Sequence, residues 1–428
     1  MLDEYTHLGT RTSGLTLDAD VMLGQDDRRR HLYVIGKTGI GKSTFMLSLI
    51  LSDLAAGRGL ALLDPHGDLA KTVIDSMPKF RIPDAIYLNP SDLEHPAGLN
   101  PLYNVEPDRR PLVAAHIVAA FHHIWADSWG PRLEYLLLNS LRLLLDANGS
   151  TLLGLPALLV NERYRERLLA TCRDGQVRQF WTKEIAAWGD QFRAEALSPL
   201  QNKIGALLSP PLLRNILGQH KPTLDIPAIM NSNRILIVNL AKGELGEGPS
   251  YLLGALLATA FAQGAEARAT IPEQERSDFN LYADEFQNFA TDSFASILSE
   301  ARKYRLSLTL AHQFLAQVPP LLQKAVLGNA GSLIVFRVGA EDAATLAPEL
   351  GLHSPSALSD LPNYRAWARL ISDGSPADAF LLMTEYPEIA TAGHAAAVIA
   401  RTRARHTRPR RQVETAIDRF IADPMPLS

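Results

Sequence analysis

The sequence has one cysteine, Cys172, among 428 residues, and it has no long apolar run. A single cysteine excludes an intramolecular disulfide and is typical of a reducing compartment. The longest apolar stretch, Tyr251 to Ala262, falls short of the ~18 residues that a membrane-spanning helix needs. The start, Met1 to Tyr5, has neither the basic nor the apolar region of a secretory signal. We therefore expect a soluble, cytoplasmic protein without direct membrane insertion.

The formal net charge of −4 conceals a basic segment near the C-terminus. Residues 401–411 contain six arginines and no acidic residue. Such a run is either a solvated tail or a contact for a nucleic-acid backbone or an acidic partner, and the sequence leaves both open. A second cluster, Arg28 to Arg30, favours a surface or inter-subunit patch.

A glycine-rich segment is the most informative motif that is present. Gly36 to Ser43 fits the pattern G-x-x-x-x-G-K-[ST], between the apolar run Leu32 to Ile35 and the helical pattern Thr44 to Leu54. A strand that turns into a helix through such a loop aims backbone N–H groups at one point, where polyphosphate binds. Lys42 would reach the β and γ phosphates, and the Ser43 hydroxyl would bind Mg²⁺ between them. The nucleotide-binding residues expected are Gly36, Lys37, Thr38, Gly39, Ile40, Gly41, Lys42, Ser43 and Thr44.

Short apolar runs separated by helical patterns predict a parallel sheet. From Asp108 to about Leu217 the pattern changes to long stretches of 3.6-residue period. The fold class expected is α/β, a P-loop domain with a mainly parallel central sheet interrupted by an all-helical insertion domain. The strands expected are Leu32–Ile35, Leu60–Leu63, Ala85–Leu88, Ile235–Leu240, Phe279–Ala283, Leu306–Ala311, Leu333–Val338 and Ala366–Ile371. The domain boundaries expected are 1–105 and 231–400 for the two parts of the nucleotide-binding domain, 106–230 for the insertion and 401–428 for an arginine-rich tail.

An acidic pair supplies what a phosphate loop lacks for hydrolysis. Asp284 and Glu285 follow directly after the expected strand Phe279–Ala283. Asp284 would hold Mg²⁺ through water, and Glu285 would act as the general base on the attacking water. The alternative, a surface acidic pair at a strand end, is disfavoured by the apolar residues before it and by the phosphate loop upstream.

Two further residues fit phosphoryl transfer. Arg302, at the end of the helical pattern after Glu285, is a candidate arginine finger, because a guanidinium arriving from outside the loop neutralises charge that develops on the γ phosphate. Gln313 follows the expected strand Leu306–Ala311, where it could orient water or contact the γ phosphate. Helix-end arginines and strand-end glutamines are also common without any function.

Five motifs in this order resemble the HerA/FtsK superfamily, and within it the conjugative coupling ATPases of type IV secretion, the TraG/TraD type. They lie at Gly36–Thr44, Asp64–Asp68, Tyr282–Phe289, Ala301–Gln313 and Phe336–Ala343. The helical block falls where those ATPases carry their all-α domain. The resemblance implies a RecA-like domain in a homo-hexameric ring that hydrolyses ATP with Mg²⁺ and moves DNA through its pore.

The resemblance also implies roles for single residues. Arg302 corresponds to an arginine that acts across the subunit interface, and Gln313 to a glutamine that contributes to the site. Asp64 and His66 match a motif near the nucleotide without an assigned step, so a structural turn is the other interpretation. Arg337 is a second candidate finger.

The sequence differs from coupling proteins in one feature, and this difference leaves other functions open. Coupling proteins usually begin with transmembrane helices, and this sequence shows none. Docking on a separate protein at the inner membrane would replace such an anchor, with a relaxase, a nuclease or a secretion-channel protein as candidate partners. Two other functions stay open: an ATPase that drives protein export or pilus assembly, and a nucleotide-gated scaffold that recruits a nuclease or relaxase.

Overall fold

The computed structural model describes residues 4–13, 16–290, 292–387 and 393–424. The chain divides into two compact units. The first, here called the sheet unit, comprises Met1–Leu88, Ile226–Ala241 and Leu257–Arg401. The second, the helical unit, comprises Asn89–Asp225, Lys242–Leu256 and Thr402–Ser428. The division predicted from the sequence at residues 105, 230 and 400 remains a prediction.

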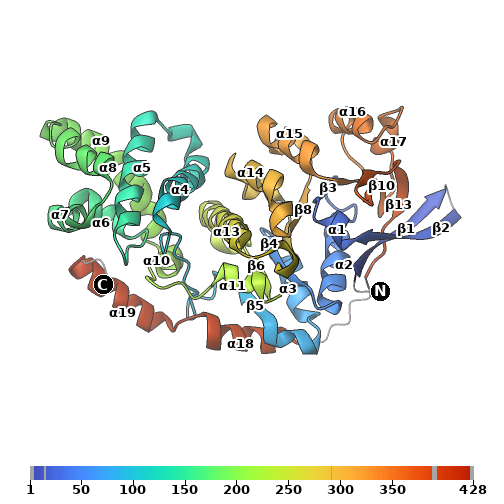
Figure 1. Cartoon of the computed structure of the whole chain (residues 1–428), viewed down its shortest axis with the longest axis horizontal. Helices are drawn as coiled ribbons and strands as arrows, with labels where there is room; N and C mark the ends of the chain where they lie inside the picture. The colour runs from blue at the N-terminus through green and yellow to red at the C-terminus, as the bar shows by residue number, and fades with distance from the viewer. Residues whose placement is uncertain (1–3, 14–15, 291, 388–392, 425–428) are drawn as a thin grey trace. The chain divides into compact units, whose positions relative to one another are not determined.

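A large mixed sheet forms the centre of the sheet unit (Figure 1). Within the described residues it has eleven strands in the order β2-β1-β13-β10-β9-β3-β8-β7-β4-β6-β5. The strands from β9 to β5 in this order are mutually parallel, and β10, β13, β1 and β2 are antiparallel to their neighbours. The parallel strands are β3 (Leu32–Ile35), β4 (Gly59–Asp64), β5 (Ala85–Leu88), β6 (Ile235–Asn239), β7 (Phe279–Ala283), β8 (Leu306–His312) and β9 (Ser332–Val335).

The parallel strands confirm the predicted α/β fold class, and each overlaps a strand expected from the sequence. Every residue of these strands is buried, as expected where helices cover both faces of a parallel sheet. Such strands are continuous apolar runs in the sequence, so their positions can be found without structural information.

The antiparallel part of the sheet was largely missed. The strand expected at Ala366–Ile371 is β10 (Arg365–Arg369) followed by the short β11 (Ile371–Ser372), which pairs with β12 (Ser375–Pro376). The strands β1 (Tyr5–Ser13), β2 (Thr16–Gly24) and β13 (Phe380–Met383) were not expected. In β1 and β2 polar and apolar side chains are mixed, because only part of each strand is covered, whereas β13 is a run of only four apolar residues.

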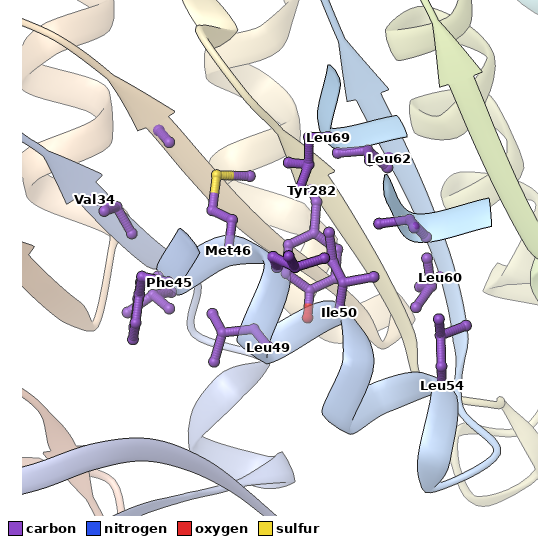
Figure 2. Close-up of a cluster of buried hydrophobic side chains, with 14 of the residues drawn as sticks. Val34, Phe45, Met46, Leu49, Ile50, Leu54, Leu60, Leu62, Leu69 and Tyr282 are labelled. Atoms are coloured by element: carbon purple, nitrogen blue, oxygen red, sulfur yellow. The ribbon is translucent and has the colours of Figure 1, made fainter. Parts of the chain in front are cut away.

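Helices α2 (Lys42–Ala55) and α3 (Asp68–Asp75) cover one face of the parallel strands. Phe45, Met46 and Leu49 of α2 pack with side chains of the strands, such as Val34 and Leu62, in one apolar cluster (Figure 2). The cluster fixes α2 against the sheet, and with it the loop that precedes α2.

The other face of the strands carries a second set of helices. Phe261, in α13 (Glu247–Ala267), stacks on Phe279 of β7 with ring centroids 5.8 Å apart. Phe294, in α14 (Asp292–Glu300), stacks on Phe286 just after β7 at 6.2 Å. The remaining helices of the sheet unit include α1 (Gln25–Arg28), α11 (Ile226–Asn231), α15 (Pro320–Asn329), α16 (Ala340–Glu349) and α17 (Ser356–Ser359).

The helical unit has no strand among its described residues, as predicted for the insertion. Its two central helices, α4 and α5, begin and end within two residues of the predicted stretches Leu112–Ile124 and Leu133–Leu145. No helix in the described part of the chain is long and apolar enough to cross a membrane. Its α-helices are α4 (Arg110–Ile124), α5 (Pro131–Asp146), α6 (Gly154–Val160), α7 (Glu162–Thr171), α8 (Gly175–Gln179), α9 (Asp190–Leu208), α10 (Pro211–Leu217), α12 (Lys242–Leu245) and α19 (Arg410–Ala422).

The arginine-rich segment 401–411, interpreted from the sequence as a tail, belongs largely to α18 (Ala395–His406) and α19. Arg403 pairs with Asp92 at 2.8 Å, and Arg410 pairs with Glu94 at 3.1 Å and Glu414 at 2.9 Å. These ion pairs occupy guanidinium groups that an extended basic tail would offer to a phosphate backbone.

The cluster Arg28 to Arg30, predicted from the sequence as a surface or inter-subunit patch, is at the surface only in part, because Arg28 is buried. Arg28 is 1% exposed, and its guanidinium donates to both carboxylate oxygens of Asp53 in α2, at 2.6 and 3.0 Å. Arg29 forms an ion pair with Asp278 at 2.6 Å. A run of basic residues does not reveal that acidic partners approach from elements far away in the sequence.

Candidate active site

The glycine-rich loop connects β3 to α2 and comes very close to its neighbours at two glycines. A Cβ atom on Gly36 would lie 2.5 Å from Ile40 Cδ1 and 2.6 Å from Phe336 Cβ. Gly41 has φ 116°, and a Cβ there would lie 2.9 Å from Cδ1 of Tyr364. Both positions therefore require glycine.

The N-terminus of α2 supplies free donors to this loop. The first helical hydrogen bond runs from Phe45 N to Gly41 O at 2.9 Å, so the amides of Lys42, Ser43 and Thr44 have no partner within the helix. Unpaired amides and the positive end of the helix dipole point to the same place, which makes it an anion site.

Lys42 lies in the same loop and is 6% exposed. Its Nζ donates to the carbonyl oxygens of Gly36, at 2.6 Å, and Lys37, at 3.0 Å. Burial lowers the pKa of Lys42, and the carboxylates of Glu285 and Asp284 oppose this shift. The ammonium group therefore rests on loop carbonyls that it can exchange for phosphate oxygens.

The acidic pair lies at the end of β7. Asp284 and Glu285 are 4% and 5% exposed, and the amide of Asp284 donates to Leu63 O of the neighbouring strand at 3.1 Å. Burial raises the pKa of Asp284 to about 7, with further contributions from the negative charges of Glu285 and Asp64. Lys42 and His66 act in the opposite direction. The raised pKa shows a crowded acidic site in which the charged form of Asp284 lacks sufficient compensation.

Two glutamines hold the carboxylate of Glu285. Gln313, which follows β8, donates from Nε2 to Oε1 at 2.9 Å, and Gln287 donates from Nε2 to Oε2 at 2.8 Å. The backbone of Glu285 is left-handed, with φ 45°, which is rare for a residue with a long side chain. The sequence analysis identified Gln313 but not Gln287, although Gln287 lies in the motif Tyr282–Phe289 together with Glu285.

These groups meet because of the strand order. The strands β3, β8 and β7 are neighbours and parallel, so the residues that follow them lie at one edge of the sheet. The structure thus brings together Lys42, Asp284, Glu285 and Gln313, as the sequence predicted for one site.

Asp64 is the last residue of β4 and His66 follows it, at the same edge of the sheet. The Asp64 carboxylate is fully buried and accepts from the amides of His66, at 2.9 Å, and Ala70, at 2.8 Å. Asp64 therefore closes the turn into α3, which supports the structural interpretation of this motif. The side chain of His66 is exposed.

Arg302 lies far from this edge within its own chain. It belongs to the turn Ala301–Tyr304, which leads into the first residue of β8, whereas Gln313 follows the last. The seven residues of β8 span roughly 20 Å at about 3.3 Å per residue. Arg302 lines an open cleft of about 600 Å³ at the amino edge of the sheet, together with Arg29, Arg30 and Glu300.

Arg337 lies beside the phosphate loop. Its carbonyl oxygen accepts from the amide of Lys37 at 2.9 Å, and its guanidinium donates to Leu361 O at 3.1 Å and to Asn363 Oδ1 at 3.0 Å. The side chain therefore orders the segment Leu361 to Tyr364.

Comparison with known proteins supports the same resemblance. Residues 7–110 match the family model described as the central domain of helicase HerA. No curated protein sequence matches the chain.

Solved structures match nearly the whole chain. The plasmid coupling protein TrwB in complex with ADP and Mg²⁺ has 16% identity and a TM-score of 0.62, over 91% of this chain and 97% of TrwB. VirB4 of Thermoanaerobacter pseudethanolicus has 15% identity and a TM-score of 0.60, over 90% of this chain and 98% of VirB4. The chain is therefore similar to the central domain of HerA over residues 7–110, and it has the P-loop fold of TrwB and VirB4.

Proposed function

We propose that this chain is an ATP-hydrolysing motor that works as a homo-hexameric ring and translocates DNA. The observation that carries the hydrolytic part is the carboxylate of Glu285, held by Gln313 and Gln287 at the edge where the phosphate loop ends. A loop that only bound nucleotide would need no oriented base beside it.

ATP binds through residues 36–44. The amides at the start of α2 receive the phosphates, and Lys42 exchanges the carbonyls of Gly36 and Lys37 for phosphate oxygens. Ser43 and, through water, Asp284 would hold Mg²⁺, which usually takes one or two carboxylates together with substrate phosphates. These oxygen ligands fit Mg²⁺. Burial of the negative charge of Asp284 raises the pKa of this residue, and a cation beside it would compensate that charge. The bound metal neutralises charge on the phosphates.

Glu285 is the general base. The oxygen of a water molecule forms a bond to the γ phosphorus while the bond to the bridging oxygen of ADP breaks, and the carboxylate of Glu285 takes the proton. Gln313 and Gln287 fix the direction of that carboxylate. Gln313, through its hydrogen bond to that carboxylate, also helps to orient the attacking water.

Arg302 completes the site of a neighbouring subunit. Its position at the amino edge of the sheet keeps it from the phosphate loop of its own chain. In a ring, the amino edge of one subunit can face the carboxyl edge of the next subunit, because each interface of a ring joins two different surfaces of the same protein. A guanidinium supplied in this way stabilises charge on the transferring phosphoryl group.

Substitution of the base tests the hydrolytic assignment. A Glu285→Gln protein is expected to bind ATP as the wild type does and to lose turnover by about 100-fold or more. Glu341→Gln, at an exposed position in α16, is the matched control and should keep wild-type turnover. Undiminished turnover in Glu285→Gln would remove Glu285 as the base.

DNA is the cargo that we propose because TrwB is described as a plasmid coupling protein. An ATPase that drives protein export or pilus assembly would share the phosphate loop and the acidic pair, so it is the second candidate. Single- or double-stranded DNA should raise the ATPase rate of a DNA translocase. An unchanged rate with either form would favour protein export, and binding of ATP without hydrolysis would favour a nucleotide-gated scaffold that recruits a nuclease or relaxase.

A further inference from the structure

Tyr364 contacts the phosphate loop directly, although it belongs to none of the sequence motifs. Its amide donates to Ile40 O at 2.9 Å, and its ring lies where a side chain on Gly41 would be. Gly41 precedes Lys42, the first residue of α2. The tyrosine ring is therefore next to the amides that receive phosphate.

The backbone of Tyr364 is held in an unfavourable conformation. Its φ is 61°, in the left-handed region that bulky residues avoid. Its carbonyl oxygen accepts from both the amide, at 2.9 Å, and the hydroxyl, at 3.2 Å, of Thr384, which follows β13. A residue kept in this region by several bonds is a feature that concentrates at functional sites.

Tyr364 is 41% exposed, although its ring contacts the loop at Gly41. The part of this residue that its neighbours leave uncovered is available to a ligand that occupies the loop.

The direction of the bound nucleotide follows from the strand order. Glu285 and Gln313 follow β7 and β8, which lie on one side of β3, and the γ phosphate must face them. Tyr364 precedes β10, on the opposite side of β3 beyond β9. A nucleotide with its γ phosphate toward Glu285 therefore has its nucleoside end toward Tyr364.

We propose that Tyr364 stacks on the base of the bound nucleotide. This inference rests on the proposed function. An aromatic ring can stack on any base, because every base has a π-face.

Comparison of two ligands distinguishes the contribution of the base to binding from that of the phosphates. ATP and inorganic tripolyphosphate share the phosphate chain, and only ATP has a nucleoside. Affinities of the full-length protein for both ligands, with Mg²⁺, are measured by calorimetry for the wild type, Tyr364→Phe and Tyr364→Asn. Asparagine tolerates the left-handed region, so Tyr364→Asn removes the ring with little change to the backbone.

Loss of stacking should weaken ATP binding by Tyr364→Asn about 5- to 100-fold, the range reported by alanine substitution for stacked bases. Tripolyphosphate binding should stay within about twofold, and Tyr364→Phe should bind both ligands within about threefold of the wild type. Tyr103→Asn, which removes an equally exposed tyrosine from the helical unit, should change neither affinity. If Tyr364→Asn does not fold, Tyr364→Gly takes its place with the same expectations.

Two results would overturn the inference and leave the proposed function intact. In the first, Tyr364→Asn binds ATP as tightly as the wild type does, so the ring does not contact the base. In the second, ATP and tripolyphosphate lose affinity equally, so the ring only supports the loop. If the wild-type protein bound neither ligand, this result would contradict the proposed function, and it would also contradict the stacking of Tyr364 on a bound base.

Discussion

At the scale of single residues, Glu285 is the position that several features converge on. It is buried, its backbone is left-handed, and both of its carboxylate oxygens accept a glutamine amide. A residue strained in this way persists only when its surroundings hold it. In the proposed mechanism, the two glutamines keep the carboxylate of the general base in one direction.

Removal of the amide of Gln313 should affect the chemical step more than binding. For Gln313→Ala we expect kcat to fall roughly 10- to 100-fold while the affinity for ATP stays within about twofold, because the carboxylate of Glu285 loses one of its two donors. Steady-state kinetics and calorimetry check this, with Gln274→Ala at an exposed turn as the control. A large loss of affinity with unchanged kcat would assign Gln313 to binding alone.

The pKa of Asp284 gives a prediction about pH. The folded protein holds the proton up to about pH 7, whereas the unfolded chain releases it near the ordinary value of 3.8. Stability therefore falls as the pH rises from about 4 to about 7, by up to roughly 4 kcal/mol, and stays low above pH 7. Without nucleotide or Mg²⁺, Asp284→Asn should unfold at a higher temperature than the wild type at pH 8, and this difference should shrink toward pH 4. A difference independent of pH would show that Asp284 does not titrate in this window.

At the scale of elements, a buried ionic network anchors α2 beneath the site. The carboxylate of Asp53 accepts from Arg28 at 2.6 Å, Arg58 at 2.9 Å, Asn280 at 3.0 Å and the Tyr282 hydroxyl at 2.6 Å. These donors come from α1, from the segment before β4 and from β7. The helix that positions the phosphate loop is thereby tied to three other parts of the sheet unit.

Loss of the central carboxylate should destabilise the protein strongly. Asp53→Ala leaves the buried guanidinium of Arg28 without its acidic partner, and the expected cost is about 3–5 kcal/mol. Asp26→Ala breaks the ion pair between Arg29 and an aspartate that is 88% exposed, and should cost about 1 kcal/mol or less. Chemical denaturation of both variants measures the difference, and equal costs would contradict the structural importance of Asp53.

The sequence predicted those elements whose pattern is determined locally. The strands β3, β5 and β7 begin and end at the predicted residues, since a strand buried on both faces must be apolar throughout. The hairpin β1–β2 was missed, because partly covered strands carry mixed residues. Arg28 was misread because its partner, Asp53, is brought to it only by the packing of α2.

For the candidate site too, some residues could be predicted from the sequence and others could not. The parallel strands of this fold class end at one edge of the sheet. The residues that come after those strands could therefore be predicted to lie together: Lys42, Asp284, Glu285 and Gln313. Tyr364 belongs to no motif, and its contact with Gly41 depends on the antiparallel pairing of β10, which the sequence did not reveal.

At the scale of the whole molecule, the finger role that we propose for Arg302 requires an assembly. Arg302 and the phosphate loop lie at opposite edges of one sheet, so a single subunit cannot bring them together through local motion of a turn. Each interface of a ring would join one such pair of edges. The catalytic centre then exists only between subunits.

Assembly should therefore depend on nucleotide and determine activity. With a non-hydrolysable ATP analogue and Mg²⁺, we expect a particle of about six subunits of 46.9 kDa. The ATPase rate per subunit should rise with protein concentration until the ring is complete. Mass measurement by light scattering checks the first expectation, and a fully active monomer would contradict both.

The most direct test of a catalytic centre shared between subunits is the ATPase rate of mixed rings. Lys42→Ala and Arg302→Ala proteins should each be nearly inactive alone. In an equal mixture, a subunit with intact Lys42 can receive Arg302 from its neighbour, so activity should return to about a quarter of the wild-type rate if subunits mix at random. A mixture that stays as inactive as its components, although its subunits exchange, would show that Arg302 does not act on a neighbouring site.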